Sequence, residues 1–285
     1  MSAGSEIRKA QAELRAASTE AIPWVVWLAR FGYAVKGLVY LLIGVFAVQA
    51  AIGAGGRITG PEGAIASIGR QPFGQVLLGL AALGLFGYAL WRFVQAWVDP
   101  ERKGKDAKGI VQRLGYAASG VVYAGFGFYA VRLLMGAASS AEGQSGGSED
   151  WTASLMAQPF GLWLVALAGL IIIGAGVYQF YEGITARFRD DLMLHEMSDE
   201  EIKWSTRAGR MGYVARGVIY AIIGGFLVLA AWRSNPEEAG GIGEALSTLA
   251  SQPYGPWLLG LVGAGLIGYG LFAFVLARYR RIFVT

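Results

Sequence analysis

The sequence predicts an all-α integral membrane protein whose six transmembrane helices form three parallel helical-hairpin repeats in a pseudo-threefold bundle. Three observations predict this fold class. The 285 residues are 55% hydrophobic and 15% charged, whereas typical soluble domains are about 25% charged. Six apolar stretches are long enough to cross a bilayer, and two short motifs recur three times in the same order.

Each predicted span has the length that a bilayer requires, because a helix needs about 20 mostly apolar residues to cross the hydrocarbon core. Lipid leaves open backbone groups unsatisfied, so helices are expected at membrane depth. The alternation of period two that marks a membrane barrel is absent. The predicted spans cover residues 31–52, 74–98, 114–137, 161–186, 211–232 and 255–277.

The distribution of basic residues predicts the orientation of these spans. Of the 24 lysines and arginines, 17 lie in the two terminal tails and in the loops 99–113 and 187–210, and three lie in the other loops. Cytoplasmic loops carry such an excess, so both termini are expected in the cytoplasm. The net charge of +4 follows from this topology, and no nucleic-acid partner is expected.

An internal repeat organises the chain. One block reads Arg-x-Gly-Tyr-x-x-x-Gly-x-x-Tyr and a second reads Gln-Pro-aromatic-Gly. The copies begin at Arg30, Arg113 and Arg210 and at Gln71, Gln158 and Gln252. Each unit is an odd-numbered span, an outer loop and an even-numbered span, so all units share one orientation. Parallel repeats are related by an axis along the membrane normal, and a row of hairpins without a closed axis is the alternative.

The repeats set the predicted domain organisation, which is a single membrane domain. A cytoplasmic tail (1–21) precedes repeat 1 (22–98), repeat 2 (99–186) and repeat 3 (187–281), whose residues 187–209 form a cytoplasmic linker. Short outer helices are expected over residues 64–68, 151–155 and 245–249, with the motif proline beginning the next span. Residues 136–150 form a Gly/Ser-rich insertion that is expected to be flexible.

Glycine and tyrosine share one face of the odd-numbered spans, because they recur at helical spacings of three, four and seven. Glycine lets a neighbouring backbone approach, and a tyrosine stripe is typical of interhelical packing, with a cavity lining as the alternative. The predicted packing residues are Gly37, Gly120, Gly217, Tyr40, Tyr123 and Tyr220. On the even-numbered spans they include Gly87, Gly174 and Gly268.

These motifs resemble the bacterial membrane family called domain of unknown function 1206, which is described as three tandem copies of a two-helix unit. The resemblance covers roughly residues 22–281 and rests on both motif blocks in all three copies. It implies a multi-pass protein of the bacterial inner (plasma) membrane. The family has no assigned activity to carry over. Lys36 and Ser119 occupy equivalent positions, so this site differs between copies.

Six polar residues inside the spans form the candidate intramembrane cluster. They are Lys36, Arg92, Gln95, Gln179, Glu182 and Arg216. An ionisable group at mid-bilayer costs roughly 2.5–3.5 kcal/mol and marks a functional candidate. Glu182 is the only acid in a span, and its position allows pairing with Arg92, Lys36 or Arg216 across the bundle. Structural ion pairing near the interface is the alternative to a ligand, ion or proton site.

A second candidate site is the arginine that opens each repeat. Arg30, Arg113 and Arg210 either form a cationic ring that contacts anions or lipid headgroups, or anchor the helices at the interface by snorkelling. No catalytic, metal or cofactor site is predicted. The chain has no cysteine and one histidine, His195, which excludes thiolate and multi-histidine sites, and no P-loop or other catalytic motif is present.

The leading functional prediction is therefore a non-enzymatic scaffold or accessory protein associated with lipid. Its expected partners are anionic headgroups on the cytoplasmic side and another membrane protein, and the oligomeric state is left open. The alternative is a small-solute or ion transporter or channel that uses the polar cluster in the inner half of the bundle. A membrane sensor acting through the loop 187–210 is a third reading.

Overall fold

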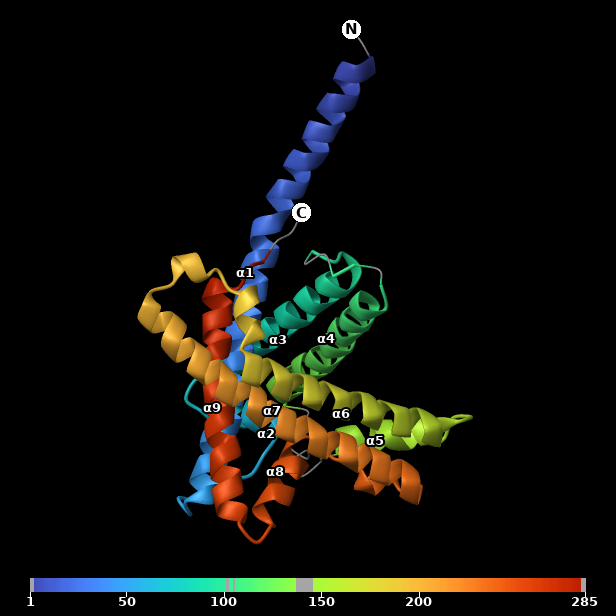
Figure 1. Cartoon of the computed structure of the whole chain (residues 1–285), viewed down its shortest axis with the longest axis vertical. Helices are drawn as coiled ribbons and strands as arrows, with labels where there is room; N and C mark the ends of the chain where they lie inside the picture. The colour runs from blue at the N-terminus through green and yellow to red at the C-terminus, as the bar shows by residue number, and fades with distance from the viewer. Residues whose placement is uncertain (1–2, 101–102, 105, 137–145, 283–285) are drawn as a thin grey trace.

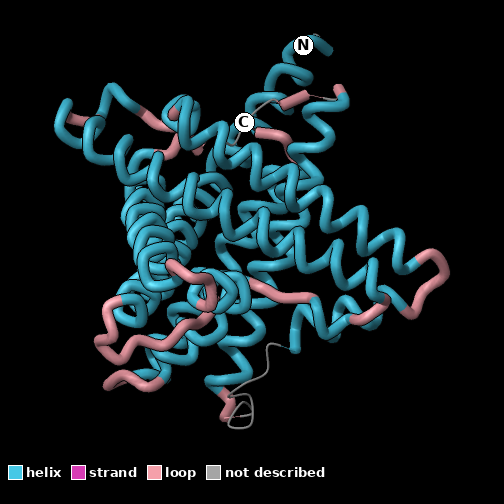
Figure 2. Tube along the Cα trace, turned by 60° about the horizontal axis from the view of Figure 1, so that its bottom comes forward, coloured by secondary structure: helices cyan, strands magenta, loops and turns pink. Residues whose placement is uncertain are grey.

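The computed structural model describes residues 3–100, 103–104, 106–136 and 146–282 (Figure 1). In this part of the chain all regular structure is helical and no strand occurs (Figure 2). Six helices are long and apolar enough to span a membrane. They are α1 (Ala3–Ala51, spanning from Trp24), α3 (Gly74–Trp97), α4 (Ala107–Leu134), α6 (Gly161–Thr185), α7 (Asp199–Arg233) and α9 (Gly255–Tyr279). The chain is a multi-pass membrane protein, as predicted.

Three short helices occupy the loops within the hairpins, where short segments were expected. They are α2 (Pro61–Gly69), α5 (Gly146–Met156) and α8 (Ile242–Ala250). The N-terminus of α8 is closed by Glu244, whose carboxylate accepts from the Gly241 N–H at 2.8 Å, a capping arrangement that satisfies a free backbone donor. Part of the predicted flexible insertion is thus helical from Gly146, and residues 137–145 lie outside the described residues.

The Gln-Pro-aromatic-Gly block forms a tight turn in each repeat, and the prediction that its proline begins the next helix is wrong. The glycine N–H donates to the glutamine carbonyl at 2.8 Å in all three copies. The helix then begins at that glycine, after an N-cap aromatic residue. A Cβ on Gly74 would overlap the Gly69 carbonyl, so the recurring glycine is required by this close approach.

The six spanning helices pack in the spatial order α4, α3, α1, α9, α7, α6. The most extensive pairings join neighbouring repeats: α3 with α4, α6 with α7, and α9 with α1. Within repeats, α1 packs on α3 and α7 packs on α9, but α4 and α6 have no comparable packing on each other. In Figure 1 the α3–α4 pair and the α6–α7 pair accordingly run apart. The α1–α9 contact joins the first and third repeats, and the ring of helices stays open at one seam, between α4 and α6.

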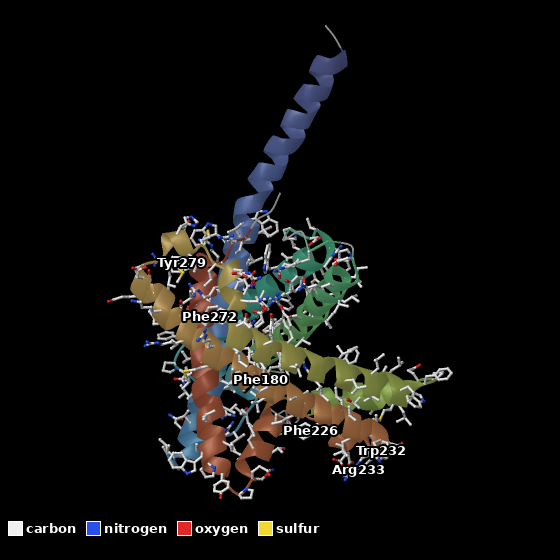
Figure 3. The ribbon with its side chains drawn as sticks, in the orientation of Figure 1. Phe180, Phe226, Trp232, Arg233, Phe272 and Tyr279 are labelled. Atoms are coloured by element: carbon white, nitrogen blue, oxygen red, sulfur yellow. The ribbon has the colours of Figure 1, made fainter. Side chains whose placement is uncertain are left out.

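The predicted glycines of the odd-numbered spans lie in the pairings between repeats. Of those on the even-numbered spans, Gly87 and Gly268 pack within their own repeats, whereas the packing predicted for Gly174 is wrong, because a Cβ there would meet no atom within 4 Å. A Cβ on Gly37 would come within 2.8 Å of the Gly270 carbonyl, and one on Gly120 within 2.8 Å of Phe93. A Cβ on Gly217 would lie 2.7 Å from Phe180, which Figure 3 places where α6 crosses α7. Because small residues let helices approach in lipid, these glycines explain why the pairings between repeats are close.

The segment between α6 and α7 closes over the end of the bundle where α9 ends. Two 3-10 helices, η1 (Arg187–Asp191) and η2 (Leu194–Glu196), precede the start of α7. The Met193 N–H donates to the Tyr279 carbonyl at 2.8 Å, and the Arg281 N–H donates to the Asp191 carbonyl at 2.9 Å. Phe188 is buried and stacks on Tyr213 with ring centroids 4.9 Å apart. This end is therefore capped by packed side chains.

Candidate functional site

Lys36 of α1 lies at the centre of the bundle and is only 2% exposed. Its ammonium donates to the Tyr88 hydroxyl of α3 at 2.8 Å. The rings of Tyr88, Tyr269 and Tyr123 surround it, with centroids 4.6, 5.1 and 5.5 Å from Nζ. Cation–π contact of this kind partly replaces lost hydration. Helices α3, α4 and α9 thus each supply a ring to one lysine of α1.

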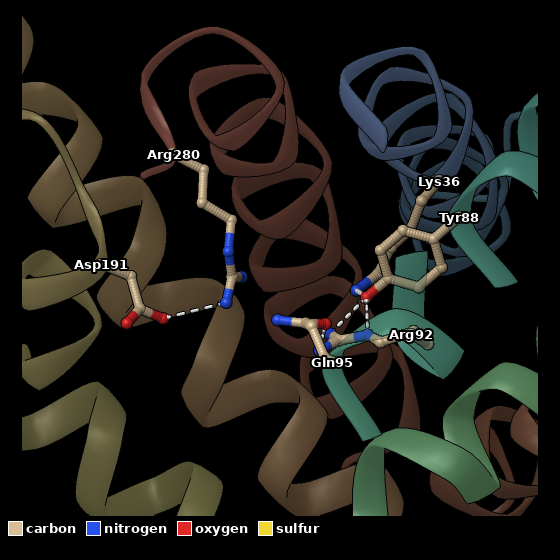
Figure 4. A network of polar contacts seen from close by, with 6 residues as sticks. All are labelled: Lys36, Tyr88, Arg92, Gln95, Asp191 and Arg280. Atoms are coloured by element: carbon tan, nitrogen blue, oxygen red, sulfur yellow. Dashed lines mark hydrogen bonds and ion pairs between the residues drawn. The ribbon is translucent and has the colours of Figure 1, made fainter. Parts of the chain in front are cut away.

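Arg92 of α3 continues this network one turn along the helix (Figure 4). Its Nε donates to the Tyr88 hydroxyl at 2.8 Å, and its Nη1 donates to the Gln95 side-chain oxygen at 3.0 Å. The guanidinium also lies 5.1 Å from the Tyr116 ring of α4. One tyrosine hydroxyl therefore accepts from two cations, Lys36 and Arg92.

Arg216 of α7 occupies the position equivalent to Lys36 and is 8% exposed. It donates to the Tyr220 hydroxyl and to the Gln179 amide oxygen of α6 at 3.1 Å when that amide is turned to face it. Its guanidinium lies 4.3 Å from the Tyr269 ring. Its Nε is buried without a hydrogen-bond partner. We call Lys36, Arg92, Arg216 and the tyrosines around them the cation–tyrosine cluster.

The charge in this cluster is uncompensated within the described part of the chain. No acidic side chain forms an ion pair with Lys36, Arg92 or Arg216 there. The three strongest charge neighbours of Lys36 are Arg216, Arg92 and Arg280, all of them cations. Buried charges are normally paired because their desolvation is costly. The arrangement is therefore suited to holding an anion.

Arg280 adds a fourth cation at the capped end of the bundle. It pairs with Asp191 of η1 at 3.3 Å (Figure 4). Its guanidinium lies 5.2 Å from the Tyr33 ring. The sequence prediction assigned Arg280 to the basic C-terminal tail and did not include it in the cluster. It also missed Tyr88 and Tyr269, although both follow a repeat glycine that the prediction had aligned.

Glu182 does not join the three cations, so the pairing across the bundle that its sequence position allows is not formed. Its carboxylate is buried beside the Tyr178 hydroxyl, and its charged neighbours are Asp191, Arg187 and Asp190. Three of the six predicted polar residues thus belong to the cluster, and two more contact its arginines. Gln95 contacts Arg92, and Gln179 contacts Arg216.

The three repeat arginines have different surroundings and do not form one ring of equal contacts. Arg113 donates from Nε to the Ala96 carbonyl at 2.7 Å and from its terminal nitrogen to the Trp97 carbonyl at 3.2 Å. It therefore caps the C-terminus of α3, where basic side chains satisfy free carbonyls. Arg30 has a buried Nε without a hydrogen-bond partner, and Arg210 is exposed.

The predicted tyrosine triplet lies within the cluster. Tyr40 packs edge-on against Tyr269 with centroids 4.8 Å apart, and Tyr123 packs on Tyr88 at 4.5 Å. Tyr220 accepts from Arg216. These rings therefore both pack between helices and face the cations. In the described residues no group of three His, Asp or Glu side chains could hold a metal ion.

Comparison with known proteins agrees with this repeat architecture. The model of the family Domain of Unknown Function (DUF1206) matches residues 31–99, 114–186 and 211–280, one match for each hairpin. The chain belongs to the DUF1206 family.

A relative in the same size range supports this assignment. The chain is 35% identical over 264 residues to "Uncharacterized protein YxxB" of Bacillus subtilis (strain 168), covering 92% of this chain and 94% of the relative. No solved structure matches the chain. The site's chemistry must therefore be read from its own residues.

Proposed function

We propose that this DUF1206 protein is a non-enzymatic, lipid-associated protein of the bacterial inner membrane that binds an anion at the cation–tyrosine cluster. The observation that carries the proposal is the burial of Lys36 and Arg216, beside the half-buried Arg92, without an acidic partner. The excess of basic residues in the tails and in the loops 99–113 and 187–210 supports cytoplasmic termini.

The tyrosines stabilise the cations only in part. Cation–π contact contributes about 2 kcal/mol when desolvated, whereas the effective desolvation penalty is several kcal/mol for each buried ion. A bound anion would accept from the unpartnered Nε of Arg216 and form charge-assisted hydrogen bonds, which are roughly twice as strong as neutral ones. Anion binding thus supplies the interaction that the protein itself lacks.

Thermal unfolding of the full-length protein in dodecyl maltoside tests this proposal. The anionic probes are inorganic phosphate and dihexanoyl phosphatidic acid, and the zwitterionic comparison is dihexanoyl phosphatidylcholine. A ligand that binds only the folded state stabilises it by about 2.7 kcal/mol at 100 Kd. We expect at least one anionic probe to raise Tm and the phosphatidylcholine probe to leave it unchanged.

Two variants locate the effect. Arg216→Gln should remove the anion-dependent rise in Tm, because it removes the buried guanidinium. Arg132→Gln should keep it, because Arg132 lies exposed in the last turn of α4. An equal rise in wild type and Arg216→Gln, or no rise with either anionic probe, would reject anion binding at the cluster.

Transport of the bound anion is the second candidate function. It is favoured by the placement of Lys36 and Arg216 inside the bundle rather than at the headgroups. Vesicles reconstituted with the protein should then take up labelled phosphate faster than protein-free vesicles. The Lys36→Met variant should abolish this difference. Uptake no faster than that of protein-free vesicles would leave the protein as a binder of its anion.

A further inference from the structure

We infer that an anionic lipid enters the bundle sideways, through the open seam between α4 and α6, and places its phosphate on Lys36, Arg92 and Arg216. This inference rests on the anion binding proposed above and adds the ligand class and the route. It follows from comparing the three within-repeat seams, two of which are closed and one of which is open.

The first glycine of the repeated block shows the difference between the seams directly. A Cβ on Gly32 would lie 2.7 Å from the Tyr88 Cβ, and one on Gly212 would lie 2.6 Å from the Tyr269 Cβ. The equivalent Gly115 would meet no heavy atom within 4 Å. The same sequence feature thus closes the seams of repeats 1 and 3 and faces open space in repeat 2.

A second set of equivalent positions explains why repeat 2 stays open. In the closed seams, Gly84 lies against Val35 and Gly265 lies against Ala215, so closely that an added Cβ would overlap the partner side chain. Repeat 2 has Ile171 at this position, and Ile171 is 63% exposed. A branched side chain where the other repeats require glycine prevents α4 and α6 from approaching. The opening is therefore determined by the sequence.

A third substitution removes the side chain that would fill the opening. Tyr88 and Tyr269 are both at most 2% exposed, and their rings cover Lys36 and Arg216. The equivalent residue of repeat 2 is Ala175. The even-numbered helices of repeats 1 and 3 thus each place a tyrosine over a cation, whereas α6, beside the open seam, has no tyrosine at this position.

Both walls of the seam reach the cluster at their inner faces. Helix α4 supplies the Tyr116 ring beside Arg92 and the Tyr123 ring beside Lys36, and α6 supplies Gln179 beside Arg216. Farther out the walls are apolar, with Val122 of α4 and Ile171 of α6 both more than half exposed. A seam with cations at its inner end and apolar walls matches a phosphate headgroup with its acyl chains.

A lipid fits this route better than a free anion does. The end of the bundle nearest the cluster is capped by the segment 187–192, in which Phe188 and Leu192 are 3% and 1% exposed. Arg280 and Asp191 pair across that cap. The seam between α4 and α6 instead opens toward the bilayer. Glu182, the acid on α6, lies among the charged loop residues Arg187, Asp190 and Asp191 rather than among the three cations.

The test measures how tightly the detergent-purified protein binds dioleoyl phosphatidylglycerol, by native mass spectrometry of lipid adducts. Ala175→Tyr restores the missing ring while leaving every cation in place. We expect it to weaken binding at least about tenfold, equivalent to about 1.4 kcal/mol. Val177→Tyr is the matched control, because two residues along a helix place it on roughly the opposite side, where Val177 is 63% exposed. Its affinity should stay within about twofold of wild type.

A second variant that fills the seam keeps the test valid if Ala175→Tyr does not fold. Gly115→Leu fills the seam from α4 at a position where an added Cβ meets nothing, so it should keep the wild-type Tm and lose affinity like Ala175→Tyr. Val121→Leu is its control on the same helix, since Val121 is 55% exposed and lies about 120° around the helix from Gly115. Wild-type affinity in both blocking variants would overturn lateral entry.

The outcomes separate this inference from the function on which it rests. If inorganic phosphate raises Tm in wild type and Ala175→Tyr alike, and phosphatidylglycerol binds both equally, the ligand is a free anion and the lipid route is wrong. If Arg216→Gln binds phosphatidylglycerol as wild type does, the cluster is not the site and both proposals fail. Loss of lipid binding in Arg216→Gln and Ala175→Tyr, with retention in Val177→Tyr, supports both.

Discussion

The same glycine-to-alanine change should have opposite effects in different repeats. Gly32 and Gly115 occupy equivalent positions in repeats 1 and 2. In the closed seam of repeat 1, a Cβ on Gly32 would lie 2.5 Å from the Tyr88 backbone nitrogen and 2.8 Å from the Gly84 carbonyl oxygen. Both are backbone atoms, so the helices must separate to accommodate the methyl group. In the open seam, a Cβ on Gly115 meets nothing within 4 Å.

The expected size of this difference follows from the two environments. Overpacking a close contact costs about 1–3 kcal/mol, so Gly32→Ala should destabilise the protein by that amount. Replacing a helical glycine by alanine without a clash gains about 0.5–1 kcal/mol, so Gly115→Ala should be neutral or stabilising. The two variants should therefore differ by about 1.5–4 kcal/mol, which corresponds to roughly 3–16 °C in Tm at about 2–4 °C per kcal/mol.

The assay is thermal unfolding in a mild detergent at one scan rate, followed by the fluorescence of the nine tryptophans. Gly212→Ala should behave like Gly32→Ala, because a Cβ there would lie 2.6 Å from the Tyr269 Cα. If Gly32→Ala and Gly115→Ala unfold at the same temperature, the assignment of closed and open seams is wrong.

Three further predictions concern the cluster, a helix cap and the topology. Tyr88→Phe removes the hydroxyl that accepts from Lys36 and Arg92. Hydrogen bonds to charged groups contribute about 1.5–3 kcal/mol, so the Tm of this variant should fall. The control Tyr254→Phe, at an exposed loop position, should leave Tm unchanged. Arg113→Ala removes the cap on α3 and should lower the unfolding free energy by about 1–2 kcal/mol, whereas a cap that is not needed would leave it unaltered. In this cysteine-free chain, a cysteine replacing Arg57 should react with an impermeant maleimide in intact cells and one replacing Lys108 should react only after lysis, and the reverse pattern would contradict cytoplasmic termini.

The sequence predicts the fold to the level of individual helices because membrane helices leave strong local patterns. Span length, basic loops and the repeated blocks each depend on nearby residues, and the six spans and three outer helices follow from them. The role of Pro72 was predicted incorrectly because proline is common in the first turn of a helix but also occurs in tight turns before one. Here the approach of the following glycine to the preceding short helix decides where α3 begins.

The candidate site was predictable only in part, because it depends on which helices become neighbours. Lys36, Arg92 and Arg216 were identified from their cost inside a span. Their relation to Tyr88, Tyr269 and Arg280 requires the packing of α3, α9 and the chain end, which no local pattern contains. Glu182 was expected among the cations because it is the only acid in a span, but its helix position turns it toward the loop that follows α6.

The three repeats differ at positions that carry no polar group. Aligning Gly84, Ile171 and Gly265 shows one bulky residue at a position that is otherwise glycine. Only the close approach at Gly84 and Gly265 reveals that this single difference separates α4 from α6. Differences between equivalent repeats therefore indicate asymmetric sites that composition alone does not reveal.

The packing of the first spanning helix against the last has a consequence for biosynthesis. As the chain leaves the ribosome, α1 emerges first, yet its glycine face finds its main partner only when α9 has been inserted. Helices α3 and α6 likewise find their main packing partners, α4 and α7, only when the next hairpin has been made. The bundle therefore cannot mature one repeat at a time. Until α9 has been inserted, the buried lysine of α1 lacks the Tyr269 ring, so a chain truncated before α9 should be a substrate for membrane quality control rather than a smaller working protein.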